Sequence, residues 1–363
     1  MIWLVAAGAL LVASWLVLWR RARFGWVRSS GRPDERRAAG TVRTVHFPAK
    51  DGTRLEAWLY LPEGVRRPAV VVMAAGLGGT KDALESFAWA FVERGLAVLS
   101  FDYRCFGGSE GVPRHWVAPP RHREDYEAAI DFVRRDLGET VDPARLALWG
   151  SSFSGGTALV TAARREDVRA LVVQCPYLAT PPHLQPRGLA MARFVVLATL
   201  DMLRIFPPIY VPLFGRPGEW AFATSDENPS VAAFDGPLGS DFWRQLPTPP
   251  LGGWENRMLA RGLATIDEIV PMDVADQIRC PVLFVAARRD DMVPHAFVEE
   301  AHARLAGRSE LASYDCGHFD LYVGAAHAAN ARHQADFIAR AVAPAGDAWP
   351  MIAQGRSAAP GTR

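Results

Sequence analysis

The chain has little cysteine for its length. Its 363 residues include only four cysteines, which are widely separated and form no Cys-x-x-Cys pair. This spacing excludes a disulfide-rich secreted scaffold, and it offers no zinc-type ligand cluster. We expect the four thiols to be small buried side chains in a reducing compartment. They are Cys105, Cys175, Cys280 and Cys316.

An excess of charge is also absent. The chain has 40 basic and 39 acidic residues, which gives a formal net charge of +1. Proteins that bind nucleic acid present a strongly basic surface, and this composition provides none, so we expect no nucleic-acid partner. Half of the residues are hydrophobic. That is enough for one large core, or for a core with a modest accessory domain.

A long uncharged run lies at the N-terminus. Residues 2–19 would extend roughly 27 Å as a helix, close to the hydrocarbon thickness of about 30 Å. Arginines follow this run, at Arg20, Arg21, Arg23 and Arg28. A cleavable signal peptide has its positive charges before the apolar run, so the sequence predicts an uncleaved single-pass membrane anchor. The positive-inside rule then places the rest of the chain in the cytoplasm.

The body of the chain begins with a linker and a hairpin. Residues 20–40 are polar and rich in Arg, Gly and Pro, which predicts a linker. Residues 42–47 and 55–61 follow, and the turn signal Asp51-Gly52 between them predicts an antiparallel hairpin.

Short apolar runs then alternate with amphipathic stretches. Buried strands are predicted at residues 69–74, 97–101, 146–149, 170–174, 282–286 and 310–314. Helices are predicted at residues 82–94, 124–136, 155–165, 296–306 and 325–342. This alternation is typical of a doubly wound, mostly parallel sheet of the α/β class, formed here by residues 41–178 and 270–342.

Residues 179–269 interrupt the alternation and predict an inserted lid. Within this lid, residues 189–206 are apolar except for Arg193, Asp201 and Arg204, which fall within roughly 80° of arc on a helix. Such a helix either packs between core and lid or meets lipid beside the anchor. The tail, residues 343–363, has the composition of a disordered segment.

A glycine- and serine-rich turn follows the predicted strand 146–149. Its sequence is Gly150-Ser151-Ser152-Phe153-Ser154-Gly155-Gly156, and a helix follows. A nucleophile on a tight strand-turn-helix needs small residues two before and two after it, because the neighbouring backbone approaches closely. Ser151 and Ser154 are alternative candidates. Only Ser152, however, has small residues both two positions before it and two positions after it, at Gly150 and Ser154, while standing at the end of the strand. Ser152 is therefore the candidate nucleophile.

A serine nucleophile needs a base, and the base needs an acid to orient it. Asp290 follows the strand 282–286, and His318 follows the strand 310–314. Both come at the carboxyl ends of strands, the edge where Ser152 lies. Asp291 is the rival acid. We rank Asp290 first because it lies four residues before Pro294, the offset expected of a turn that opens into the next helix.

An oxyanion hole would complete the site. One donor is the backbone N–H after the nucleophile, that of Phe153. The second is expected in the loop 75–80, with the N–H of Leu77 as the candidate.

Together these residues resemble the α/β-hydrolase superfamily, in its bacterial esterase, lipase and serine-aminopeptidase-like branch. The stretches that carry the resemblance are FDYRCFGGSEG, LALWGSSFSGG, FVAARRDDMVP and CGHFDLY. It covers residues 41–342 and implies Ser152 as nucleophile, Asp290 as acid and His318 as base, with Leu77 and Phe153 as oxyanion donors. One departure is Ala75-Gly76 where this branch commonly has His-Gly.

The expected activity is hydrolysis of a carboxylic ester through an acyl-enzyme, with no metal or organic cofactor. The apolar lid and the predicted anchor favour a lipophilic acyl ester as the small-molecule substrate, and a membrane partner through residues 2–19 and the lid helix 189–206. The alternatives are a peptidase of the same fold and a binding protein without catalysis. Ester, thioester and amide substrates all remain open.

Overall fold

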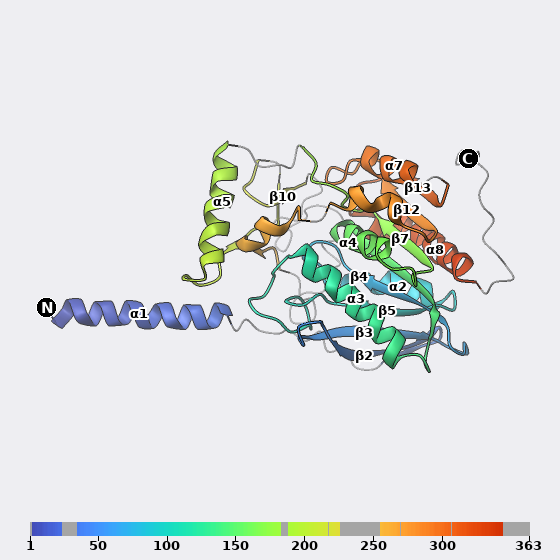
Figure 1. Ribbon diagram of the computed structural model, residues 1–363, viewed down its shortest axis with the longest axis horizontal. Helices are drawn as coiled ribbons and strands as arrows, with labels where there is room; N and C mark the ends of the chain where they lie inside the picture. The colour runs from blue at the N-terminus through green and yellow to red at the C-terminus, as the bar shows by residue number, and fades with distance from the viewer. Residues whose placement is uncertain are drawn as a thin grey trace.

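The structure is a computed structural model, and it describes residues 2–23, 35–182, 188–216, 218–225, 255–268, 270–305 and 307–343. The first element is helix α1 (Ile2–Arg23), of which the side chains of residues 6–17 are described. In Figure 1, α1 projects away from the rest of the molecule.

One large sheet runs through the described part of the chain, with the strand order β1-β2-β3-β5-β4-β6-β7-β12-β13 (Figure 1). The pairs β1–β2, β2–β3 and β3–β5 are antiparallel, and the other neighbouring pairs are parallel. The strands are β1 (Glu35–Arg37), β2 (Gly40–Pro48), β3 (Arg54–Pro62), β4 (Ala69–Ala74), β5 (Ala97–Phe101), β6 (Asp142–Ser151), β7 (Ala170–Gln174), β12 (Val282–Ala287) and β13 (Ser309–Tyr314).

Helices cover both faces of this sheet. Buried side chains of α3, α4 and α7 belong to one hydrophobic core, and those of α2 and α8 belong to the core on the other face. These two cores are why β4, β5, β7 and β12 consist entirely of buried residues. The helices are α2 (Glu85–Val92), α3 (Pro119–Asp136), α4 (Ser152–Ala163), α7 (His295–Arg304) and α8 (Gly324–Ala341), with 3-10 turns η1 (Lys81–Leu84) and η5 (Asp320–Tyr322).

The predicted doubly wound sheet and hairpin are confirmed, although several element bounds differ from the predicted ones, and two of these differences have a clear local cause. Strand β6 begins four residues before the predicted start, because its first part pairs irregularly with β4 and has no apolar pattern. The helix predicted at 82–94 is divided into η1 and α2. It ends early because Gly95, at φ +76°, turns the chain out of the helix.

The lid forms its own small structure above the sheet. Its helix α5 (Gly188–Leu203) replaces the predicted helix 189–206, and its short strands pair only with one another. These elements are β8 (Tyr210–Val211), β9 (Phe214–Gly215), β10 (Ala223–Thr224), β11 (Met258–Leu259) and η3 (Ala260–Thr265), followed by η4 (Pro271–Gln277) where the core resumes.

The predicted polar stripe of α5 separates into three different environments. Asp201 is buried, and its carboxylate accepts hydrogen bonds from Arg261 Nε at 2.8 Å and Arg261 Nη2 at 2.9 Å. Arg193 stacks over the ring of Trp220 at 3.8 Å, and Arg204 lies beyond the helix end. The ion pair with Arg261 therefore attaches α5 to η3.

The predicted membrane anchor is contradicted. Within the described residues, no helix combines the length and the apolar character that crossing a bilayer requires. The single-pass anchor at residues 2–19 and the orientation deduced from it are thus wrong, and a membrane partner, whether through α1 or through the lid helix, is not supported.

Two other predictions concern residues that are partly or wholly outside the described ranges. The tail predicted at 343–363 lies outside them from residue 344 onward. Of the predicted linker 20–40, residues 24–34 lie outside them, and β1 occupies Glu35–Arg37.

Candidate active site

Ser152 lies at the sharp turn between β6 and α4. Its backbone has φ +52°, a left-handed conformation that is costly for a residue with a side chain. A Cβ on Gly150 would lie 2.4 Å from the carbonyl oxygen of Ser154, and a Cβ on Gly76 would lie 3.0 Å from Cβ of Ser152. A side chain is therefore excluded two residues before this serine, and it would also crowd the serine from Gly76 in the neighbouring loop.

Ser154 occupies the position where a second glycine is more common. Its hydroxyl lies 2.5 Å from the phenol oxygen of Tyr103 and 3.4 Å from that of Tyr126. Tyr126 also donates to the carbonyl of Trp149, one residue before the turn, at 2.6 Å. The serine hydroxyl thus belongs to a buried hydrogen-bond network that holds the turn against the sheet.

Asp290 and His318 meet at the carboxyl ends of β12 and β13. His318 Nδ1 lies 2.7 Å from Asp290 Oδ2, and both side chains are almost fully buried. The other carboxylate oxygen accepts the backbone N–H groups of Met292 at 2.9 Å and Val293 at 2.7 Å. With Nδ1–H donating to Asp290, Nε2 is left unprotonated and can accept a proton.

The rival acid Asp291 has a different role in the structure. Its Oδ1 accepts a hydrogen bond of 2.9 Å from Ser225, which directly follows β10 in the lid. The two neighbouring aspartates therefore have different hydrogen-bond partners. Asp290 bonds to His318, and Asp291 bonds to Ser225 in the lid.

Leu77 and Phe153, the two candidate oxyanion donors, line the same cavity as Ser152. Phe153 is in the first turn of α4, where backbone N–H groups have no helical partner and the helix dipole favours negative charge. Leu77 lies in the loop 75–80, closed by a hydrogen bond from Gly79 N to Gly76 O of 3.0 Å.

A buried ionic cluster, which the sequence reasoning missed, holds the far end of this loop. Lys81 is completely buried, and its Nζ lies 2.8 Å from Glu56 and 2.5 Å from Asp102. Its backbone N–H donates to the same Asp102 at 2.8 Å. Burial alone would lower the pKa of Lys81, but the two carboxylates outweigh it and raise that pKa. The available signal was position, because Lys81 directly follows the loop 75–80.

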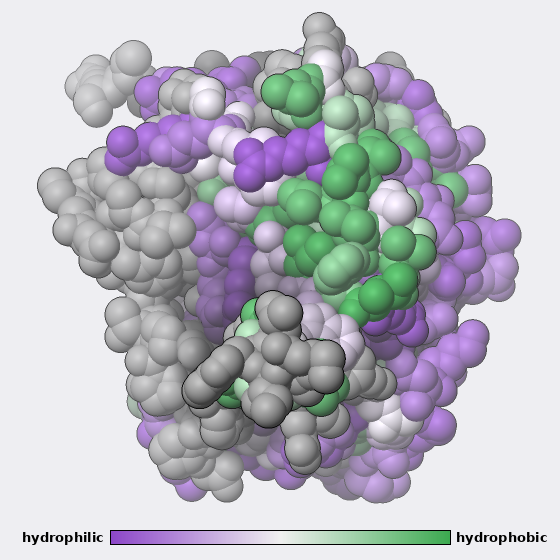
Figure 2. Space-filling model, turned by 90° about the vertical axis from the view of Figure 1, so that its left-hand side faces the viewer, coloured by the Kyte–Doolittle hydropathy of each residue, from purple (hydrophilic) through white to green (hydrophobic). Residues whose placement is uncertain are grey.

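A cavity of about 520 Å³ opens onto Ser152. Leu77, Ser152 and Phe153 line it together with the loop after Asp290. Helix α5 supplies one apolar wall at helical spacing, through Met191, Phe194, Val195, Ala198, Thr199 and Met202. Figure 2 shows the apolar surface of the face that carries α5.

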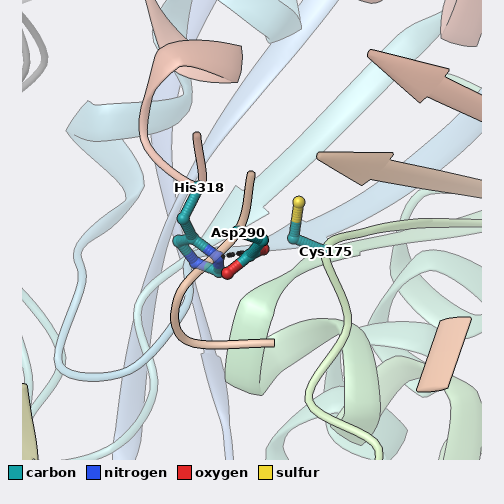
Figure 3. Close-up of side chains that lie close together, drawn as sticks. All are labelled: Cys175, Asp290 and His318. Carbon is teal, nitrogen blue, oxygen red and sulfur yellow. Dashed lines mark hydrogen bonds and ion pairs between the residues drawn. The ribbon is translucent and has the colours of Figure 1, made fainter. Parts of the chain in front are cut away.

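Cys175 stands beside Asp290 and His318 (Figure 3). Its Sγ, a carboxylate oxygen and a ring nitrogen lie within 4.8 Å of one another, so their atoms form a possible metal-binding set. Burial raises the pKa of the Cys175 thiol well above its ordinary value, and the Asp290 carboxylate raises it further. A protonated thiol is a poor ligand, and His318 Nδ1 already bonds to Asp290, so these groups fit a hydrogen-bonded pair better than a metal centre. None of the four cysteines is in a disulfide, and all four are buried, as the sequence predicted.

Comparisons with known proteins agree with this geometry. The family model described as serine aminopeptidase, S33, matches residues 66–323. The quorum-quenching protein AidA of Acinetobacter baumannii is 33% identical over 82% of this chain and 94% of its own length. The thiohydrolase aneE of Aspergillus aculeatus is 29% identical over 79% of this chain and 89% of its own length.

Solved structures show the same fold. The structure of DcsB in complex with its substrate analogue has a TM-score of 0.70 at 22% identity, over 84% of this chain and all of the other. The monoacylglycerol lipase of Paleococcus ferrophilus has a TM-score of 0.57 at 17% identity, over 83% of this chain and 99% of its own. The strand order, the serine turn and the family match lead to one conclusion: this chain belongs to the serine aminopeptidase S33 family of α/β hydrolases.

Proposed function

We propose that this chain is a serine hydrolase that cleaves an apolar carboxylic ester through an acyl-enzyme on Ser152. The observation that carries the proposal is the cavity of about 520 Å³, which is apolar over most of its wall and is lined at once by Ser152, Leu77 and Phe153. A nucleophile that opens into an apolar cavity suits an acyl chain better than a charged peptide.

In this mechanism the hydroxyl of Ser152 attacks the ester carbonyl while His318 Nε2 accepts its proton. The backbone N–H groups of Leu77 and Phe153 stabilise the negative charge on the carbonyl oxygen. Collapse of the tetrahedral intermediate expels the alcohol, which takes the proton from His318. Water, activated by the same imidazole, then releases the carboxylic acid and regenerates Ser152. Asp290 holds the imidazole in orientation and stabilises its positive charge.

Thioesters are the second candidate substrates. Several relatives of this chain are thiohydrolases, including aneE and apmlB, which is 29% identical over 82% of this chain. The same acyl-enzyme chemistry applies, with a thiol as the leaving group.

The proposal is tested first at the nucleophile. Ser152→Ala should lower kcat on 4-nitrophenyl esters by about 10⁶ and abolish labelling by a fluorophosphonate probe. Ser151→Ala is the matched control, because it removes the neighbouring hydroxyl and should remain labelled. Labelling of Ser152→Ala would show that the nucleophile is a different residue.

The substrate class is tested with matched ester, thioester and amide compounds of one acyl chain. We expect turnover of esters and thioesters to exceed that of amides. Faster turnover of amides would favour the peptidase alternative. A folded wild-type protein in which Ser152 is not labelled would favour a binding protein without catalysis.

A further inference from the structure

The apolar cavity wall contains one polar group of side chains that the mechanism does not use. Tyr177, Thr180 and Asp267 line the same cavity as Ser152. Tyr177 and Thr180 belong to the loop after β7, whereas Asp267 lies on the far side of the lid sequence, after η3. The fold therefore brings these three residues together at the cavity from two separate segments.

Tyr177 and Thr180 both donate hydrogen bonds to the same carboxylate oxygen of Asp267. Tyr177 donates to Asp267 Oδ1 at 2.8 Å, and Thr180 Oγ1 donates to the same oxygen at 2.5 Å. The two hydroxyl oxygens are 2.7 Å apart. Burial raises the pKa of Tyr177, so its phenol keeps the proton that it donates. Two donors on one oxygen fix the orientation of the carboxylate.

This arrangement leaves the second oxygen of Asp267 available. Among the described residues, none donates a hydrogen bond to Asp267 Oδ2, and the side chain is exposed where the cavity opens. A carboxylate at this position can accept a hydrogen bond from a molecule in the cavity.

The same loop is connected to the nucleophile turn. Tyr177 N donates to the carbonyl oxygen of Ser152 at 2.8 Å, and the Tyr177 ring packs on Phe153 with ring centroids 5.2 Å apart. The position of Asp267 is therefore fixed relative to the reacting serine, which is the condition for selecting a substrate by a group remote from the ester.

We propose that Asp267, oriented by Tyr177 and Thr180, is a specificity-determining residue that accepts a hydrogen bond from a hydroxyl group on the acyl chain of the substrate. The inference rests on the proposed function, since it assumes that Ser152 is acylated. A hydroxyl on a long acyl chain suits a wall that is mostly apolar, and the 8-amino ester in the test below represents the cationic alternative. A site that bonds to a hydroxyl rejects the chain that lacks it.

The test compares 4-nitrophenyl octanoates that carry a hydroxyl at carbon 3, 6 or 8 with the methyl ether of each. For the wild-type chain, we expect at least one hydroxy ester to exceed its ether by about ten- to hundredfold in kcat/KM. In Asp267→Ala that ratio should fall to about one. In Tyr177→Phe and Thr180→Val, which each remove one orienting donor, it should fall by a smaller factor. Glu268→Ala, at the neighbouring exposed acid outside the cavity wall, should keep the wild-type ratio.

Fluorophosphonate labelling separates failure of this inference from failure of the proposed function. If Ser152 is labelled but the ratios are near one in the wild-type chain, or are unchanged in Asp267→Ala, the role of Asp267 is refuted and the proposed function stands. If the 8-amino ester is preferred over the 8-hydroxy ester and Asp267→Ala removes that preference, the neutral class of ligand is refuted. If Asp267→Ala does not fold, Asp267→Asn keeps the shape, and its ratio should still fall severalfold.

Discussion

The carboxyl edge of the sheet and the lid above it are held together by different forces. At the edge, buried polar groups hold the candidate site: the Lys81 cluster, the Tyr103–Ser154 contact and the Asp290–His318 pair. In the lid, the described strands contain only two residues each, and α5 leaves large apolar side chains exposed. Its clearest polar anchor is the pair Asp201–Arg261.

This difference separates two requirements of the proposed reaction. Transition-state stabilisation needs groups held within a fraction of an ångström, which buried hydrogen bonds supply. Binding an acyl chain needs mainly apolar area, which a loosely specified lid can supply. If this difference holds, substitutions at the edge should reduce catalysis or stability strongly, whereas substitutions in the lid should mainly change which acyl chains are accepted.

The largest effect is expected at the edge, from the two neighbouring aspartates. Asp290→Asn should lower kcat by about 10³–10⁴, because the amide cannot stabilise the imidazolium and favours the wrong tautomer of His318. Asp291→Asn should change kcat by only a few fold, since its amide oxygen can still accept from Ser225. Steady-state kinetics on one ester decide between them, and equal losses in both variants would refute Asp290 as the acid.

The second prediction tests the buried charges of the edge. Lys81→Met leaves Glu56 and Asp102 buried without their cation, so we expect the free energy of unfolding in urea to fall by about 3–5 kcal/mol. The control is the only other lysine of the chain, Lys50, whose side chain is 78% exposed. Lys50→Met should change that free energy by less than about 0.5 kcal/mol. Similar values for the two variants would mean that the buried ionic cluster does not stabilise the edge.

The third prediction concerns the apolar wall of the lid. Ala198 lies on the face of α5 that lines the cavity, and Ala198→Phe should fill part of the space for a chain. We expect kcat/KM for 4-nitrophenyl dodecanoate to fall about tenfold relative to the butyrate. Val196→Phe, on the same helix but outside the cavity wall, should leave the ratio near its wild-type value. Equal ratios in the two variants would mean that the acyl chain does not contact α5.

The smallest effect is a pH dependence beside the oxyanion loop. Burial raises the pKa of Asp82 from 3.8 to about 6. Between about pH 4 and pH 6 the folded chain therefore holds a proton that the unfolded chain has released, so this group lowers stability as pH rises through that window. Asp82→Asn cannot ionise, and it should gain roughly 1–2 kcal/mol relative to the wild-type chain from pH 4 to pH 7. Urea denaturation across this range measures the gain, and a difference independent of pH would contradict the shifted pKa.

The sequence predicted the edge well because its determinants are local. The apolar strands, the turn at Ser152 and the loops that carry Asp290 and His318 are each encoded in a few consecutive residues. The helix after β6 was predicted from residue 155, and in the structure it begins at Ser152 itself. The sequence could not determine which of Asp290 and Asp291 meets His318, because that choice depends on how two loops pack.

The lid was predicted only as an interruption. Its contacts join residues far apart in the chain, such as Asp201 with Arg261 and Tyr177 with Asp267, and no local pattern signals them. The Lys81 cluster was missed for the same reason, since its partners Glu56 and Asp102 come from separate strands or strand ends. The membrane anchor was wrong because an uncharged run was taken as sufficient evidence for a spanning helix.

The lid is inserted between two neighbouring strands of the sheet. The chain leaves the core after β7 and returns to it at β12, and these two strands are hydrogen-bonded neighbours. An insertion between adjacent strands can change in length or sequence without altering any strand pairing, and lengthening a loop adds little entropic cost. One catalytic edge can therefore be combined with many different lids, and a new substrate range can evolve by replacing a single continuous segment.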